Sequence, residues 1–241
     1  MTNAMKPDIL VFSHSEIDSG LEKMKEKANV HQAFFTVPGE PSRLSRAIWI
    51  VDAIIMHGKH KKLSSQVEDY VKNRGGTVIL GGFFSDFVRP AVLDRWFRTS
   101  WGMPWRVGQY ERTTVLLQDP HVGLGGSNKS SLTASCSSKA LFLKNVSPSD
   151  SLYASPLGAR GESVVFGPVH VRAETSIALG KCGQGRLAYT GDVNNEQGTA
   201  EAVLVYDGFN GSFFAIDDAT YLGTPGSSTT QNRPAHHQPY C

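Results

Sequence analysis

Short apolar runs alternate with charged or turn-rich segments along the first third of the chain. Short apolar runs bounded by turn residues are typical of strands buried in a sheet, and they predict strands at 8–12, 32–37, 53–56 and 77–80. Charged segments between them predict helices. This alternation predicts a parallel sheet with helices on both faces. We therefore expect a three-layer α/β/α, flavodoxin-like sandwich with a mostly parallel central sheet and a polar insert.

The helix expected between the third and fourth strands has the clearest pattern. Ser65 and Glu68 have the spacing of a capping box, in which each side chain bonds a free backbone N–H at the helix start. One face of this helix is apolar, with Val67, Tyr70 and Val71. Gly75 can end the helix, because glycine adopts the left-handed conformation without steric cost. A further charged helix is expected at 16–28.

The pattern changes after residue 88. Residues 89–112 combine tryptophans with arginines, which favours a helix and a loop whose tryptophans pack on the domain. The polar residues 118–162 predict a loop-rich insert with one strand at 140–143. Later strands are expected at 163–166, 175–179 and 186–190, with a hairpin turn at 180–185. We expect a single domain over 1–222, and a disordered tail over 223–241 because of its Pro, Gly, Ser, Thr and Gln content.

Composition narrows the range of partners. The 241 residues are 40% hydrophobic and 19% charged, with a formal net charge of +2. This charge is too small to predict binding to nucleic acid or to a membrane surface. The three cysteines, Cys136, Cys182 and Cys241, lack the spacing of a disulfide framework or a zinc site. Since no signal-peptide core or apolar span is present, we expect a cytoplasmic protein without a metal or cofactor.

A glycine-rich bend follows the strand at 77–80. In α/β enzymes, such a bend between strand and helix presents the nucleophile, because glycine permits the strained turn. The bend here contains no cysteine. Ser85 is the nearest hydroxyl, and it lacks the Gly-x-Ser-x-Gly frame. The sequence therefore predicts an enzyme-like scaffold without its usual reactive atom.

Three segments that follow predicted strands carry a resemblance to a known family. Residues 52–58, Asp-Ala-Ile-Ile-Met-His-Gly, resemble the strand and oxyanion loop of class I glutamine amidotransferase-like domains. Residues 75–85 resemble their elbow strand, and 185–196 resemble the late strand with the His-Pro-Glu signature. Within that superfamily, the chain is most similar to the ThuA-like (trehalose-utilisation) branch, which also begins its elbow strand with a double glycine and lacks the usual cysteine context.

The resemblance implies that the glutaminase machinery is incomplete. The family's cysteine would fall near Gly82 or Phe83, which cannot attack a carbonyl carbon. Its histidine falls at Asn194, which cannot act as a general base near neutral pH. The acid alone is kept, at Glu196. Because catalytic groups that act as a unit fail together, we expect a pseudoenzyme without glutaminase activity.

We therefore expect the chain to bind a small polar metabolite or a protein partner at the carboxyl end of the sheet, where ligands of open parallel sheets bind. Backbone N–H groups of the bend would be accessible to such a ligand. The expected binding residues are His14, Gly58, Gly81, Gly82, Phe83, Asp192, Asn194 and Asn195. A homodimer is compatible with this expectation.

Other interpretations stay open at this point. Ser85, His57 and Glu196 could form the catalytic group of a hydrolase or isomerase, although Ser85 also suits a helix cap. His57 and His60 could hold a metal with Asp192 or Glu196, although surface histidine pairs are commoner. The polar residues at 192–196 could simply form a turn. The tryptophans at 96–105 could form an interaction surface, which fails if they are buried.

Overall fold

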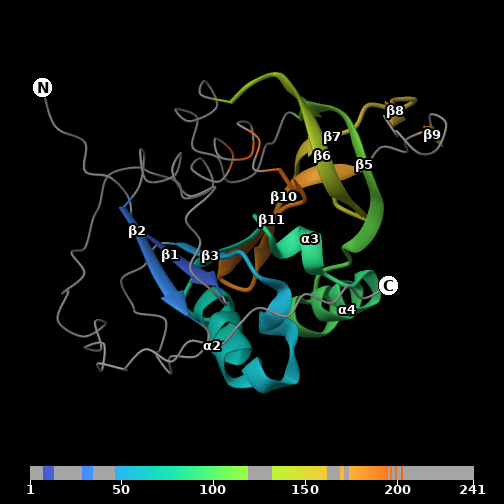
Figure 1. Ribbon diagram of the computed structural model, residues 1–241. Helices are drawn as coiled ribbons and strands as arrows, with labels where there is room; N and C mark the ends of the chain where they lie inside the picture. Colours follow the sequence, from blue (N-terminus) through green and yellow to red (C-terminus); the bar gives the residue numbers. More distant parts are fainter. Residues whose placement is uncertain are drawn as a thin grey trace, which may run out of the picture.

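The computed structural model describes residues 8–13, 29–34, 47–118, 132–161, 169–170, 174–194, 196, 199 and 202 (Figure 1). The predicted helix at 16–28, the predicted strand at 163–166 and the predicted tail at 223–241 lie outside this part. Two of the expected binding residues, His14 and Asn195, also lie outside it. Among the described residues, no helix is long and apolar enough to cross a membrane.

Five strands form a parallel half of the main sheet, in the order β2, β1, β3, β4 and β11. Their bounds are Asn29–Phe34, Asp8–Ser13, Ala47–Ile50, Thr77–Leu80 and Gly185–Thr190. The central strands are apolar because both of their faces are covered, as the buried residues of β3 and β4 show. The strand predictions at 8–12, 77–80 and 186–190 are confirmed.

The other four strands of this sheet pair antiparallel and close on themselves. They are β5 (Arg106–Leu117), β6 (Ser135–Lys144), β7 (Ser151–Ala154) and β10 (Thr175–Cys182). β10 pairs with β6 and β7, and β5 also pairs with β6 and β7. We call this closed group, seen at the upper right of Figure 1, the ring. A two-stranded sheet of β8 (Arg160–Gly161) and β9 (Val169–His170) lies outside it.

The predicted fold class, a flavodoxin-like sandwich with a mostly parallel sheet, is wrong. Antiparallel pairings are in the majority, because the ring contributes four and the β10–β11 hairpin a fifth, against four parallel pairings. The physical reason lies in residues 106–154. Parallel neighbours need a long crossover, usually helical, and the described residues of this region form strands and turns without a helix. The expected polar insert thus supplies β6 and β7, and β6 includes the strand predicted at 140–143.

Helices occur mainly between β3 and β5. The short helices η1 (Ala53–Met56) and η2 (Gly58–His60) lead into α2 (Lys61–Lys72), and α3 (Phe84–Phe87), α4 (Pro90–Trp96) and a π-helical turn, η3 (Phe97–Trp101), follow β4. α2 buries Val67, Tyr70 and Val71, as predicted, and Gly75 after it has a φ of +76°.

Two local predictions in this region are wrong. The strand expected at 53–56 is η1, and the strand is β3, at Ala47–Ile50. The Asp52 carboxylate accepts a 2.9 Å hydrogen bond from the Ile54 N–H, which caps the helical turn and ends the extended run. Ser65 and Glu68 do not form a capping box, because α2 begins at Lys61 and both lie inside it.

The tryptophans of the Trp-rich stretch are buried. Trp96, Trp101 and Trp105 are 7%, 3% and 1% exposed, so they belong to the core and the interaction-surface interpretation fails. Trp96 packs edge-on against Trp101, and Trp105 packs edge-on against Phe97. These residues share a core cluster with β3, β4 and the inner face of α2. A second cluster, on the other face of the sheet, joins β1, β3 and β4 to the ring.

Candidate functional site

Residues 81–83, here called the bend, lie at the carboxyl end of β4 beside the carboxyl end of β11. The Gly81 N–H donates to the Ile50 carbonyl oxygen at 3.1 Å, which ties the bend to β3. A Cβ atom at Gly81 would lie 2.0 Å from the Thr190 Oγ1 atom, so only glycine lets β4 leave the sheet this close to β11. Gly82 has a φ of +62°, in the left-handed region that favours glycine.

Two backbone donors of the bend are free. The Phe84 N–H donates to the Gly81 carbonyl oxygen at 3.3 Å, but within the described chain the Gly82 and Phe83 N–H groups make no hydrogen bond. Phe83 has helical dihedral angles, so a left-handed residue is followed by a right-handed one. Successive N–H groups in turn conformations of this kind form concavities that hold electronegative atoms.

Ser85 lies next to the bend, but it faces the core. It is 4% exposed, and its hydroxyl donates to the Thr190 carbonyl oxygen at 3.1 Å and lies 3.3 Å from the Tyr189 hydroxyl oxygen. Tyr189 donates in turn to the Leu141 carbonyl oxygen at 2.7 Å, and burial raises the pKa of its hydroxyl. These contacts hold α3 against β11, so Ser85 has a structural role.

His57 is exposed at the junction of η1 and η2. Its Nδ1 atom accepts a 3.4 Å hydrogen bond from the Lys59 N–H, which caps η2. Gly58 is open, since a Cβ atom there would meet nothing within 4 Å. η1 lies beside α3, but the structure gives no hydrogen bond between His57 and Ser85 in the described residues. The two residues therefore do not form a base and nucleophile pair here.

The loop after β11 is organised by the Asp192 carboxylate. Asp192 is 1% exposed and accepts hydrogen bonds from the Asn194 N–H at 2.8 Å, the Glu196 N–H at 2.6 Å and the Thr199 hydroxyl at 2.6 Å. Burial raises the pKa of Asp192, although these hydrogen bonds oppose the shift. The Asp192 carboxylate is thus occupied by hydrogen bonds within its own loop, as expected if residues 192–196 form a turn.

Glu196 is also bound within the protein. Its Oε1 atom lies 2.7 Å from Nη2 of Arg112, and its Oε2 atom accepts a 3.3 Å hydrogen bond from the Lys139 N–H. The exposed Asn194 side chain donates to Glu196 Oε1 at 3.5 Å. These contacts attach the loop to β5 and β6. Glu196 therefore lacks the free carboxylate that a catalytic group with Ser85 and His57 would need.

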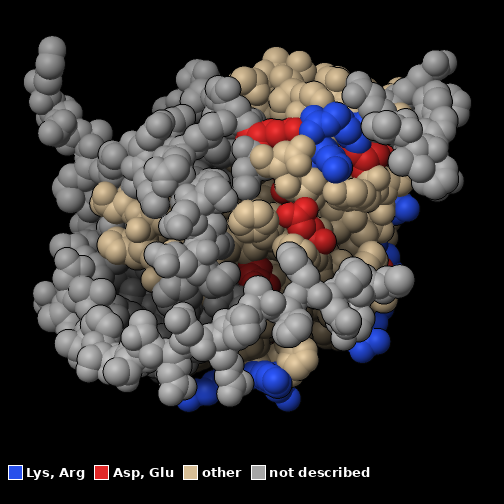
Figure 2. Space-filling model, viewed as in Figure 1, with Lys and Arg blue, Asp and Glu red and all other residues tan. Residues whose placement is uncertain are grey.

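The turn that follows the bend carries an acidic residue, Asp86. Asp86 is exposed in α3, and its pKa is raised by partial burial and by the negative charge of Asp192, with Lys139 acting in the opposite direction. Figure 2 shows acidic side chains at the surface over α3, and acidic and basic side chains together over β5 and β6. Sequence reasoning missed Asp86 as a site residue, although its place three residues after the bend was a usable signal.

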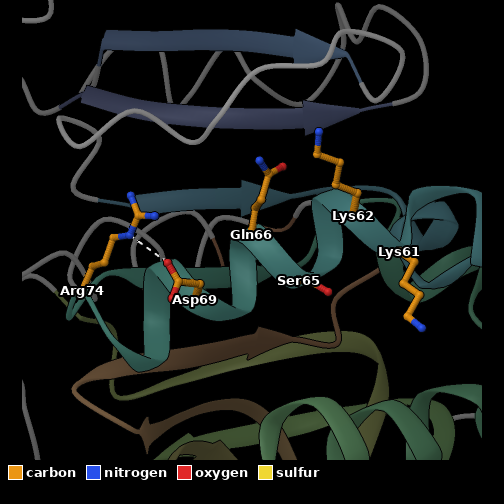
Figure 3. A pocket seen from close by; sticks show the side chains of 6 residues that line it. All are labelled: Lys61, Lys62, Ser65, Gln66, Asp69 and Arg74. Atoms are coloured by element: carbon orange, nitrogen blue, oxygen red, sulfur yellow. Dashed lines mark hydrogen bonds and ion pairs between the residues drawn. The ribbon is translucent and has the colours of Figure 1, made fainter.

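A separate hollow of about 550 Å³ lies along the outer side of α2 (Figure 3). Its described lining is Lys61, Lys62, Ser65, Gln66, Asp69 and Arg74. Asp69 and Arg74 pair with each other at 2.8 Å. The hollow is lined by the polar side of an amphipathic helix, and its lining includes no residue of the bend. Among the described residues, no group of three His, Cys, Asp or Glu side chains is placed to hold a metal ion, so the His57–His60 interpretation gains no support.

Comparison with known proteins assigns no family. No family model and no curated protein matches the sequence. Similar solved structures include β-galactosidases from Bacillus circulans sp. alkalophilus (12% identity, TM-score 0.49) and from the Antarctic haloarchaeon Halorubrum lacusprofundi (18% identity, TM-score 0.49). Each match covers 83% of this chain but only 30% and 29% of those enzymes. A cytoplasmic protein from Salmonella typhimurium has 11% identity and a TM-score of 0.47, over 83% of this chain and 97% of that one.

Proposed function

We propose that this chain is a non-glutaminase binding protein that holds a small polar ligand at the bend. The observation that carries the proposal is the pair of N–H groups at Gly82 and Phe83 that make no hydrogen bond within the described residues, beside a glycine that brings β4 and β11 together. A carbonyl or hydroxyl oxygen of a ligand would accept hydrogen bonds from both donors. Free donors at the carboxyl ends of parallel strands occupy the position where such sheets bind ligands.

The charges around the bend favour a neutral ligand. The Asp86 N–H donates to the Phe83 carbonyl oxygen at 3.2 Å, which places Asp86 in the same turn as the free donors. Partial burial is the main cause of the raised pKa of Asp86, and repulsion by the negative charge of Asp192 adds to it. A carboxylate or phosphate at the bend would meet the same repulsion. Amides, sugars and other uncharged polar molecules therefore fit the site better than anions.

Binding is favoured over hydrolysis by the contacts of the expected catalytic residues. Ser85 is buried and bonded to β11, His57 is exposed in its own turn, and Glu196 is paired with Arg112. The resemblance to class I amidotransferase-like domains, the protein partner and the homodimer stay predictions. A cytoplasmic location is also part of the proposal, and it agrees with the buried Cys182 thiol, which forms no disulfide in the described residues.

The test is a thermal-stability screen of the full chain against neutral amides, neutral sugars and their carboxylate analogues. We expect neutral compounds to raise Tm and anionic analogues to have no effect. Asp86→Asn should then admit the anionic analogue of an active compound, because the variant removes the charge that repels it. Asp69→Asn, on α2, is the matched control and should leave the selectivity unchanged. Equal binding of anions to the original chain and to Asp86→Asn would contradict the proposal.

A further inference from the structure

Trp49 of β3 carries a buried indole N–H without a hydrogen-bond partner. Its side chain is 4% exposed, and its Nε1 atom makes no hydrogen bond within the described residues. A buried donor without an acceptor costs free energy, and native proteins contain few of them. Trp101 and Trp105 share this property, but they belong to the core cluster on the other face of the sheet. Of these three indoles, only that of Trp49 lies in the cluster that joins β1, β3 and β4 to the ring.

The edge of the Trp49 indole that carries Nε1 faces the bend. A Cβ atom at Gly81 would lie 3.2 Å from Trp49 Nε1, and a Cβ atom at Gly82 would lie 3.5 Å from Trp49 Cζ2. Nε1 and Cζ2 lie on the same edge of the indole, so the N–H group is directed at the bend. Together with the Gly82 and Phe83 N–H groups, it gives the bend three donors that have no acceptor within the described residues.

The Thr190 hydroxyl lies beside the same indole edge. The point where a Cβ atom of Gly81 would stand is 2.0 Å from Thr190 Oγ1 and 3.2 Å from Trp49 Nε1, so the two groups flank one position. The hydrogen bond from the Thr190 hydroxyl to the Leu80 carbonyl oxygen is 3.5 Å long, beyond the usual range for a hydroxyl donor. Because so long a bond costs little to break, the hydroxyl can turn away and let a ligand oxygen atom reach the indole N–H.

We propose that the bend binds a neutral polyhydroxyl compound, such as a sugar, and that Trp49 donates a hydrogen bond to one of its hydroxyl groups. This inference rests on the proposed function and narrows its ligand class. A carbonyl or hydroxyl oxygen atom has two acceptor lone pairs, so a ligand with one oxygen atom satisfies at most two of the three donors. Two neighbouring hydroxyl groups satisfy all three, and each also has a proton to donate, for which the Asp86 carboxylate in the following turn is an acceptor.

The experiment is NMR of the full, ¹⁵N-labelled chain during titration with glycerol, with D-glucose and, for comparison, with acetamide, which has a single oxygen atom. The chain contains four tryptophans and so gives four indole N–H signals. The Trp49 signal is the one lost in Trp49→Phe, or it is assigned in the original chain if that variant does not fold. We expect at least one of the two polyhydroxyl compounds to shift the Trp49 indole signal together with the Gly82 and Phe83 amide signals.

Trp49→Phe keeps an aromatic ring in the core but removes the donor. It should weaken the binding of the polyhydroxyl compound about threefold to tenfold, the effect of one lost hydrogen bond, and should leave acetamide binding unchanged. Trp105→Phe is the matched control, because it makes the same change at a buried indole whose Nε1 atom also lacks a partner in the described residues. This variant should bind all three compounds as the original chain does.

The outcomes separate this inference from the proposed function. Equal affinities of Trp49→Phe and Trp105→Phe, or an unmoved Trp49 signal while the Gly82 and Phe83 signals shift, would overturn the role of Trp49 and leave the proposed function standing. A loss of acetamide affinity in Trp49→Phe as large as the loss for the polyhydroxyl compound would overturn the assignment of the ligand class. If no compound moves the Trp49, Gly82 or Phe83 signals, the inference and the proposed function both fail.

Discussion

The parallel half and the ring differ in the direction of neighbouring strands. In the parallel half, β3, β4 and β11 end at one edge, so short segments from distant parts of the chain meet at the bend. In the ring, strands run in alternate directions, and polar groups such as Glu174 sit against the paired backbones. Among the described residues, the parallel half therefore has backbone N–H groups without acceptors at its edge, whereas the ring has buried side-chain oxygen atoms without donors.

The two regions nevertheless share one core, and a substitution in the ring tests this most strongly. Phe142 of β6 is fully buried in the cluster that also holds Val11 and Ile79 of the parallel half. Phe142→Ala should lower the free energy of unfolding by about 3–5 kcal/mol, because it leaves a cavity. Leu157→Ala, at an 87% exposed side chain, should change it by less than about 0.5 kcal/mol. Denaturant unfolding should stay a single transition, and two separate transitions would show that the regions are independent.

Gly81 tests the contact between β4 and β11. In Gly81→Ala the new methyl group would overlap Thr190 Oγ1, so we expect a loss of about 1–3 kcal/mol in the free energy of unfolding. Gly58→Ala places its methyl group in open space and should be neutral within about 0.5 kcal/mol. Chemical denaturation of both variants measures the difference. Equal stabilities would mean that the strands do not meet as closely as the structure shows.

Substitution of Ser85 tests whether this residue has a structural or a catalytic role. Ser85→Ala removes the hydrogen bond to the Thr190 carbonyl oxygen, and it should cost about 0.5–1.5 kcal/mol of stability. A serine-reactive fluorophosphonate should not label the original chain, because Ser85 is buried and its hydrogen-bond partners in the described residues, Tyr189 and Thr190, are not bases. Labelling that is lost in Ser85→Ala would establish a reactive serine and support the hydrolase instead.

Asp192 gives the smallest expected effect, a dependence of stability on pH. Burial is the main cause of its raised pKa, so the folded state holds the proton more tightly than the unfolded state does. The stability contributed by Asp192 is therefore complete below its ordinary pKa of 3.8 and is lost as pH rises through the folded-state value. The stability of the original chain relative to Asp192→Asn should fall over that window in thermal unfolding. A rise over the same window would mean that the three hydrogen bonds outweigh burial.

The sequence correctly predicted those strands and turns whose residue types are typical of the structure that they form. The apolar run at 77–80 and the turn at 180–185 were predicted because strand and turn residues lie together in the sequence. β5 was missed because its side chains are mostly half-buried or exposed, so its sequence lacks an apolar run. Two apolar segments, 47–50 and 53–56, could each have formed the third strand. The hydrogen bond from the Ile54 N–H to Asp52 makes the second segment helical, and this bond cannot be inferred from composition.

The location of the candidate site could be predicted from the sequence, but the roles of its side chains could not. Gly81, Gly82 and Phe83 were selected because they follow a strand, and the structure brings them beside β11. The roles of Ser85 and Asp192 depend on where their side chains point. The hydrogen bond from Ser85 joins residues 105 positions apart, so no local pattern distinguishes a buried hydroxyl from a reactive one.

Amide NMR of the full chain with a neutral compound from the stability screen tests the proposed binding site most directly. We expect the Gly82 and Phe83 N–H resonances to shift and their exchange with solvent to slow on binding. The Gly191 N–H, which already donates to the Ser176 carbonyl oxygen at 2.8 Å, should change little and serves as the internal reference. Saturation with unchanged Gly82 and Phe83 resonances would contradict binding at the bend.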